Sequence, residues 1–357
     1  MRFMIVVLAF VLASISSLGS GAVWASPNSV AILQYHHIGD DTPRVTSVTA
    51  EELEGHFAWL KANDFTVMSL ADIQAAFADG KTLPERTAAI TIDDGWRNVY
   101  RNGLAIFKKY QYPFTVFVNP QLMAEAPHQY MNWDQLRELQ RYGAQIANHS
   151  NSHWHMTWRN DAETETEWLE RVRHDVVDAQ QQIDKQLGPQ AKHFAYPYGE
   201  YNAALQTMLE EEGFIAFAQH SGPWGVFSPD TAIPRFPASA QYASLDSLAT
   251  KLKSLALPVD DFSPQQALLE AGNTTPTFSV TLAHTNDFNK SQMTCFAGAD
   301  AIAPTWQDNT FTVTLKSAVP LGRSRVNCTV PSTSQNGRFY WYSHPFIRAD
   351  ENGRWPD

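Results

Sequence analysis

Short apolar runs alternate with amphipathic helical patterns from Val30 to about Ser254. This alternation limits the possible folds of the chain more than any other feature of the sequence. The apolar runs have the length and composition of buried strands, and the segments between them carry apolar residues at helical spacing, as at Leu53, Phe57 and Leu60. Repeated βα units favour parallel strands with helices outside them. We therefore expect an α/β fold, a distorted (β/α) barrel whose strand ends gather at one face.

The predicted strands are 30–35, 66–68, 88–92, 114–119, 145–147, 193–196 and 215–219, and the predicted helices are 50–63, 69–77, 99–110, 133–142, 161–187 and 202–212. After about Pro258 the pattern changes to alternating apolar and polar residues between Gly, Asn, Ser and Pro clusters, at 275–282, 309–315, 324–330 and 337–343. We expect a catalytic domain over 26–257 and a small antiparallel β domain over 258–357.

Residues 1–25 have the pattern of a secretory signal peptide. Arg2 supplies the positive charge, residues 5–13 form an apolar core too short to cross a bilayer comfortably, and residues 23–25 form a small-residue cleavage site. An uncleaved membrane anchor is the alternative. We expect a secreted or periplasmic protein with no stable membrane insertion after cleavage of the signal.

Charge and cysteine content narrow the class of protein further. The net charge is −11, which repels phosphate backbones, so no nucleic-acid partner is expected. Cys295 and Cys328 both lie late in the chain and would meet an oxidising compartment after export. A single disulfide between them is expected, with two buried free thiols as the alternative.

The predicted strand 88–92 ends in two adjacent carboxylates, Asp93 and Asp94, followed by Gly95. Neighbouring carboxylates repel each other, so the pair needs solvent or a cation. A cation would allow one acid to bind metal while the other transfers protons. Taken alone, the segment is equally compatible with a plain Asp-Asp-Gly turn.

Polar residues also follow other predicted strands. They are Gln-Tyr-His-His at 34–37, Asn-His-Ser-Asn-Ser-His at 148–153 and Tyr-Pro-Tyr-Gly at 196–199. His149 and His153 are four residues apart, which on a helical turn places both on one face, close enough to share a metal. Together with the paired aspartates, this spacing predicts a metal site at the strand ends.

The Thr-Ile-Asp-Asp-Gly, His-Ser-x-x-His and Tyr-Pro-Tyr-Gly segments, in this order, resemble the first three motifs of the polysaccharide deacetylases, carbohydrate esterase family 4 with its NodB-homology domain. The opening Tyr-His-His-Ile resembles the circularly permuted branch that includes poly-N-acetylglucosamine deacetylases. The resemblance covers roughly 30–254. It implies metal-dependent hydrolysis that releases acetate from an N-acetylated polysaccharide or oligosaccharide.

The resemblance also implies roles for individual residues. Asp94, His149 and His153 match the family's metal ligands, most often of Zn²⁺, which polarises the acetyl carbonyl and activates water. Asp93 matches the base that takes a proton from that water.

Further roles follow from positions around this centre. His36 matches the family's general acid, and the backbone N–H of Tyr198 matches a donor to the oxyanion. The commonest family motif has an arginine where this chain has Ala195, so another residue must orient Asp93. Arg235 is our candidate, with a surface arginine that packs on Phe236 as the alternative.

Two other functions fit the same sequence. An O-acetyl esterase acting on a polysaccharide such as acetylxylan would use the same metal site, and a non-catalytic carbohydrate-binding protein would use the same scaffold. The aromatic cluster at 339–342 fits carbohydrate binding and packing against the barrel equally well, because half of an alternating strand points inward.

Overall fold

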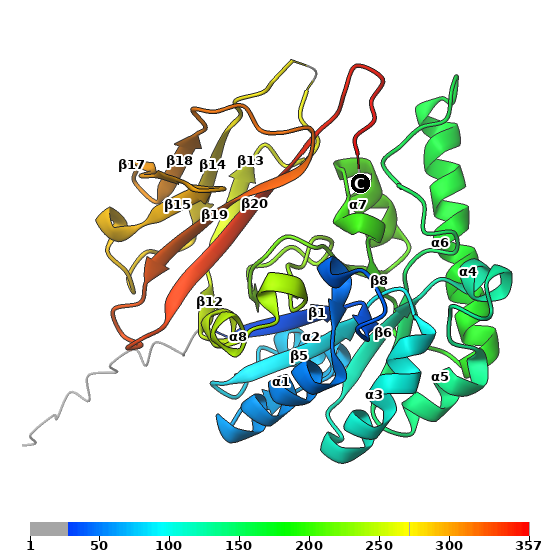
Figure 1. Ribbon diagram of the computed structural model, residues 1–357. Coiled ribbons are helices and arrows are strands. Elements are labelled where there is room, and N and C mark those ends of the chain that lie inside the picture. The colour runs from blue at the N-terminus through cyan, green and yellow to red at the C-terminus, as the bar shows by residue number, and fades with distance from the viewer. Residues whose placement is uncertain (1–27, 271, 357) are drawn as a thin grey trace, which may run out of the picture.

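The computed structural model describes residues 28–270 and 272–356, so the predicted signal peptide lies outside the described residues. Within these ranges, no helix is long and apolar enough to cross a membrane. Figure 1 shows a larger part, in which helices surround a sheet, and a second part built from the strands late in the chain.

The larger part is built on a curled sheet of parallel strands, which confirms the predicted α/β fold. Neighbouring strands in the sheet are β1 (Ser29–Tyr35), β5 (Thr87–Ile92), β6 (Phe114–Val118), β7 (Ala144–Asn148), β8 (His193–Ala195) and β9 (Ile215–Phe217). At the edges, β4 (Thr66–Val67) pairs with β5, and β10 (Trp224–Gly225) runs antiparallel to β1. A small separate ladder joins β2 (His37–Ile38) to β3 (Ser47–Val48).

A short segment that the sequence pattern did not predict joins the two edges of this sheet. β11 (Phe236–Pro237) pairs in parallel with β1. Three residues before β11, Ile233 forms a parallel bridge with Phe217 of β9. The chain between these two contacts therefore spans the gap between the first and last strands. Arg235 lies in the middle of this segment, in the wall of the barrel.

Helices cover the outside of the sheet (Figure 1). They are α1 (Ala50–Ala62), α2 (Leu70–Ala78), α3 (Arg97–Tyr110), α4 (Pro120–Glu125), α5 (Trp133–Gln140), α6 (Glu165–Leu187), α7 (Ala203–Glu211) and α8 (Leu245–Leu252). Thr164 caps α6 in a capping box with Glu167, which fixes the start of this helix four residues later than predicted. Ser69 caps α2 by accepting from the Asp72 amide, as its sequence indicates.

The second part consists of two sheets. One has the order β12 (Ser254–Ala256), β20 (Phe339–Arg348), β19 (Gly322–Pro331), β15 (Thr294–Ala297) and β16 (Asp300–Ile302). The other has the order β13 (Val259–Ser263), β14 (Thr277–Leu282), β18 (Thr310–Thr314) and β17 (Thr305–Gln307). Residues of both sheets share one apolar core, which includes Phe278, Val280, Phe311 and Tyr340.

The named strands after residue 258 pair with one another only in antiparallel fashion, which confirms the expected antiparallel β character of this region. β12 lies before residue 258 and pairs with β20 in parallel. β12 follows α8 in sequence and β20 is the last strand, so the chain returns to β12 only after it has passed through the other strands of the second part. Ala256 of β12 also donates its backbone N–H to Ser29 Oγ at 2.9 Å, so β12 contacts both parts.

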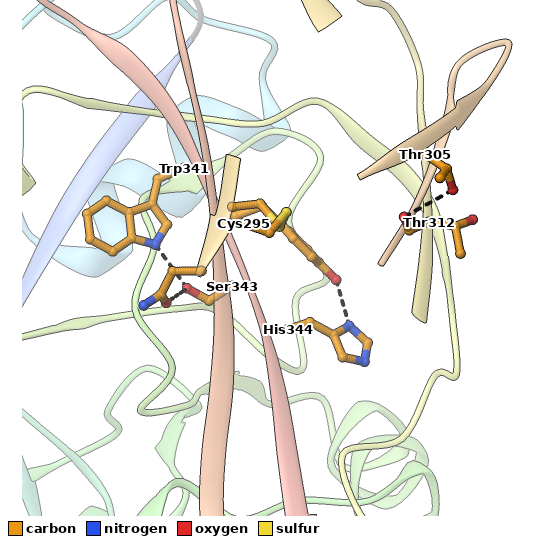
Figure 2. Close-up of a disulfide and its surroundings, with 9 residues drawn as sticks. Cys295, Thr305, Thr312, Trp341, Ser343 and His344 are labelled. Atoms are coloured by element: carbon orange, nitrogen blue, oxygen red, sulfur yellow. Dashed lines mark hydrogen bonds between the residues drawn. A yellow bond between two sulfur atoms is a disulfide. The ribbon is translucent and has the colours of Figure 1, made fainter. Parts of the chain in front are cut away.

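Cys295 and Cys328 form a disulfide, as expected, and face each other directly on β15 and β19. Figure 2 shows this bond beside β20. On β20, the Trp341 indole donates to Ser343 Oγ at 2.9 Å, and its ring packs edge-on against Phe236 of the barrel at 5.3 Å. The adjacent residue, Tyr340, is buried in the apolar core of the second part. Trp341 therefore packs the two parts together, whereas Tyr340 belongs to the core of the second part.

Candidate active site

The polar residues predicted at the strand ends all follow the carboxyl ends of parallel strands. His36 follows β1, Asp93 and Asp94 follow β5, His149 follows β7, and Tyr198 lies three residues beyond β8. Because parallel strands end at the same edge, this topology directs the side chains to one face of the barrel.

Asp94, His149 and His153 form a compact cluster with one carboxylate oxygen at its centre. Asp94 Oδ1 lies 3.2 Å from Nε2 of both histidines, and one ligand atom from each of the three residues lies within 4.8 Å of the others. Asp94 Oδ1 and His149 Nε2 are buried and have no hydrogen-bond partner. Since buried polar atoms are normally satisfied, these atoms and their donor set fit a metal ion.

The surroundings of His149 also suit a metal ligand. The Ala195 carbonyl lies 2.7 Å from His149 Nδ1, so Nδ1 carries the proton and donates to it, which leaves the Nε2 lone pair facing Asp94. Burial alone would raise the pKa of Asp94, but the two imidazoles beside it hold this pKa well below its usual range. The carboxylate is therefore ionised, as metal binding requires.

The predicted helical turn at His149 and His153 is wrong, although the two side chains do meet. The chain leaves β7 as an irregular loop in which Ser150 and His153 have φ of 65° and 56°. Side chains hold this conformation: Ser150 Oγ accepts from the His153 amide at 2.9 Å, and Asn119 donates to the carbonyls of His149 and Ser150. A left-handed backbone costs about 1–2 kcal/mol per residue, so these bonds offset strain at the site.

Asp93 lies fully buried beside the cluster, where it forms an ion pair with Arg235. The guanidinium contacts both carboxylate oxygens, at 2.7 and 2.8 Å, and is itself fully buried, which excludes the surface alternative. Gln34 donates to Asp93 Oδ2 at 2.8 Å. Burial would raise the pKa of Asp93, but the positive charge of Arg235 and the nearby imidazoles outweigh it and lower this pKa overall.

The opening of the site is lined by the partly exposed residues His36, His153 and Asp94. The side chains of His36, His153 and Asp94 are 19%, 20% and 13% exposed, whereas that of Asp93 is 0% exposed. His36 Nε2 lies 3.8 Å from Asp93 Oδ2, which is beyond hydrogen-bonding distance. A molecule that enters the site therefore meets His36, His153 and Asp94 before it meets Asp93.

Tyr198 borders the cluster from the side of β8. Its ring centroid lies 4.7 Å from that of His153, and the two rings meet edge to face. Tyr198 and Gly199 have φ of 58° and 71°, which makes a tight left-handed turn. A side chain at Gly199 would place its Cβ 2.5 Å from Gln219, so only glycine fits this position.

Two residues contact the paired aspartates although the sequence analysis did not assign them a role in the site. Gln34 is two residues before His36, so the two-residue period of a strand already placed both on one side. Trp96 donates its indole N–H to Asp94 Oδ2 at 2.7 Å. No periodic signal marks Trp96, because its position depends on the left-handed φ of Asp94 and Gly95.

Comparison with known proteins agrees with this geometry. Residues 80–217 match the polysaccharide deacetylase family. The chain is 26% identical over 277 residues to the poly-beta-1,6-N-acetyl-D-glucosamine N-deacetylase of Escherichia coli (strain K12), an alignment that covers 68% of this chain and 40% of that protein. The chain thus spans about two fifths of the length of this curated relative.

Solved structures share the fold. The deacetylase PplD of Streptococcus pyogenes, determined in complex with acetate, matches with a TM-score of 0.57 at 18% identity, over 63% of this chain and 99% of that chain. IcaB from Ammonifex degensii matches with a TM-score of 0.55 at 19% identity, over 64% of this chain and 99% of that chain. These similarities show that the curled α/β barrel is common to all three proteins.

Proposed function

Residues 80–217 of this chain match the polysaccharide deacetylase family, and from that premise we propose that the chain hydrolyses the N-acetyl groups of a polysaccharide in a metal-dependent reaction. The observation that carries the proposal is the pair of buried, unpartnered ligand atoms, Asp94 Oδ1 and His149 Nε2, next to the ion pair of Asp93 and Arg235. A metal-binding set beside a separate ionised carboxylate is what hydrolysis of an unreactive amide requires.

Asp94, His149 and His153 would hold the ion, with Zn²⁺ as our candidate because two imidazoles and one carboxylate are a usual zinc set. When bound, such an ion supplies Lewis-acid chemistry, polarising the acetyl carbonyl and lowering the pKa of water. The Nδ1 proton that His149 donates to Ala195 keeps its other nitrogen available for coordination.

Asp93 accepts the proton that the attacking water loses. Arg235 and Gln34 fix the orientation of the carboxylate, and the charge of Arg235 keeps it ionised. The same charge lowers the proton affinity of Asp93, so the carboxylate is unprotonated and free to accept a proton.

His36 and Tyr198 act on the other atoms of the amide. His36 donates a proton to the leaving nitrogen as the carbon–nitrogen bond breaks, which yields acetate and a free sugar amine. The backbone N–H of Tyr198 stabilises negative charge on the former carbonyl oxygen. The partial exposure of His36 suits contact with a bound sugar chain.

We propose β-1,6-linked poly-N-acetylglucosamine as the substrate, because the curated relative in Escherichia coli is named for this polymer. Export through the predicted signal peptide is part of the proposal, since such a polymer is met outside the cytoplasm. We also propose that residues 26–257 form the catalytic domain and residues 258–357 a β-rich domain.

A screen of acetate release tests the proposal, with β-1,6-linked poly-N-acetylglucosamine, chitin oligomers, peptidoglycan and acetylxylan as substrates. Wild-type protein should release acetate from an N-acetylated glycan, and Asp93→Asn should release none while retaining metal. Faster hydrolysis of acetylxylan than of every N-acetylated glycan would instead favour an O-acetyl esterase. No release from any substrate would favour a non-catalytic carbohydrate-binding protein.

A further inference from the structure

We propose that the second part of the chain completes the candidate active site, with Arg323 and Trp355 acting as positioning residues for the turn that carries Tyr198. They act through Glu200, two residues further along the same turn. The inference rests on the proposed function in so far as it assigns this turn a role in catalysis.

Glu200 is a fully buried carboxylate whose partners come from both parts of the chain. Its Oε1 accepts from the Trp355 indole N–H at 2.6 Å and lies 3.5 Å from Arg323 Nη1. Its Oε2 lies 2.9 Å from His155 Nδ1 on the barrel side. A buried carboxyl group is tolerated only when its oxygens have polar partners. The position of Glu200 therefore depends on residues that follow it by more than a hundred positions.

Arg323 also contacts the turn directly. It lies near the start of β19, and its Nη1 donates to the Tyr198 carbonyl at 3.1 Å. Its guanidinium carbon lies 5.5 Å from the centre of the Tyr198 ring. Arg323 thus contacts the backbone and the ring of Tyr198, and it also lies beside Glu200 at the end of the turn.

A stack of rings connects these contacts to the metal cluster. His155 lies between Trp158, at 3.7 Å, and Tyr198, at 4.0 Å, with the planes nearly parallel in both pairs. Trp355 meets Trp158 edge-on at 5.6 Å. The Tyr198 ring also contacts His153, one of the three candidate metal ligands. An unbroken series of packed rings therefore runs from the end of the chain to the site.

The turn needs such support because its own backbone is strained. Tyr198 has φ of 58°, which non-glycine residues rarely adopt without surroundings that enforce it. The direction of the Tyr198 N–H follows from this conformation, and so does its proposed contact with the oxyanion. In Figure 1 the chain leaves β20 and ends beside α7, which follows the turn in sequence.

Two variants of the full chain test the proposal. Trp355→Phe keeps the ring but removes the donor to Glu200, and Arg323→Gln removes the guanidinium, with Arg323→Lys as the conservative variant. The matched control is Arg338→Gln. Arg338 also joins the two parts, through the carbonyls of Lys253 and Glu85, but it contacts nothing in the turn.

With the proposed polysaccharide as substrate, we expect kcat to fall about 10-fold to 100-fold in Trp355→Phe and Arg323→Gln, as for other residues that orient a metal site, with KM and metal content unchanged. Arg323→Lys should recover part of the loss, and Arg338→Gln should retain wild-type kcat. An unchanged kcat in the first two variants would overturn the proposal, and so would an equal loss in Arg338→Gln.

Amide hydrogen exchange supplies a readout that needs no activity. Exchange at residues 198–200 should become faster in Trp355→Phe and Arg323→Gln but not in Arg338→Gln. If wild-type protein releases no acetate, the proposed function fails and exchange alone decides the inference. Unchanged exchange in the two variants would then overturn it.

Discussion

Arg235 and Asp93 are both fully buried, so each charge depends on the other for compensation. Arg235→Met would leave the Asp93 carboxylate buried with Gln34 as its remaining close donor. Removal of one partner of a buried pair typically costs about 3–5 kcal/mol. We expect a loss of that size in the free energy of unfolding, measured by urea denaturation.

The matched control for this variant is Arg101→Gln. Arg101 pairs with Asp41 at 3.4 Å, and both side chains are more than 60% exposed, so its removal should leave the unfolding midpoint unchanged. Equal effects of the two substitutions would contradict the account of the buried pair. Asp93→Asn would leave the Arg235 guanidinium buried without its carboxylate partner, so activity of that variant is measured on protein whose folding has been verified.

At the scale of single elements, His193 of β8 makes the free energy of unfolding depend on pH. Burial lowers the pKa of His193 from 6.5 to about 4, and the imidazole contacts Gln74 at 3.1 Å. Above pH 6.5 this histidine is neutral in both the folded and the unfolded chain. As the pH falls towards 4, the unfolded chain takes up a proton that the folded chain does not, so stability falls.

A shift of this size corresponds to about 3 kcal/mol. Wild-type protein should therefore lose about 3 kcal/mol more than His193→Gln between pH 6.5 and pH 4, measured as free energy of unfolding at each pH. Parallel pH profiles for the two proteins would contradict the buried, neutral state of His193.

The disulfide joins β15 and β19 of the second part and closes a span of 33 residues. In the chain-entropy description, a loop of this length contributes about 3–4 kcal/mol by restricting the unfolded chain. We expect the double variant Cys295→Ala/Cys328→Ala to lose about that much stability in urea. A midpoint equal to that of the wild-type protein would contradict a stabilising role for this bond.

At the scale of the whole molecule, the sequence predicted the features that follow from local periodicity, namely the strands of the barrel and the residues at their ends. The strands of the barrel were found because buried parallel strands are continuous apolar runs, and the strand-end position of Asp93, His149 and His36 follows from that assignment. The match to the polysaccharide deacetylase family at 80–217 lies within the range of the resemblance at 30–254.

The remaining features depend on contacts that no local pattern contains. β11 is two residues long, so its closure of the barrel had no periodic signal. In the loop after His149, Ser150 and His153 have left-handed conformations, which hydrogen bonds from Asn119 and to Ser150 stabilise. The four-residue spacing of the two histidines is the same in this loop as in a helical turn, so the sequence alone does not distinguish them. The bond from Trp355 to Glu200 joins residues 155 positions apart.

The most direct test of the central claim is acetate release from β-1,6-linked poly-N-acetylglucosamine before metal removal, after chelation and after addition of Zn²⁺, with metal content measured in parallel. Wild-type protein should lose activity on chelation and regain it with zinc, and His149→Ala should bind no zinc and remain inactive. His174→Ala, at an exposed position, is the control and should behave as wild type. Full activity after complete metal removal, or wild-type zinc content in His149→Ala, would contradict the account.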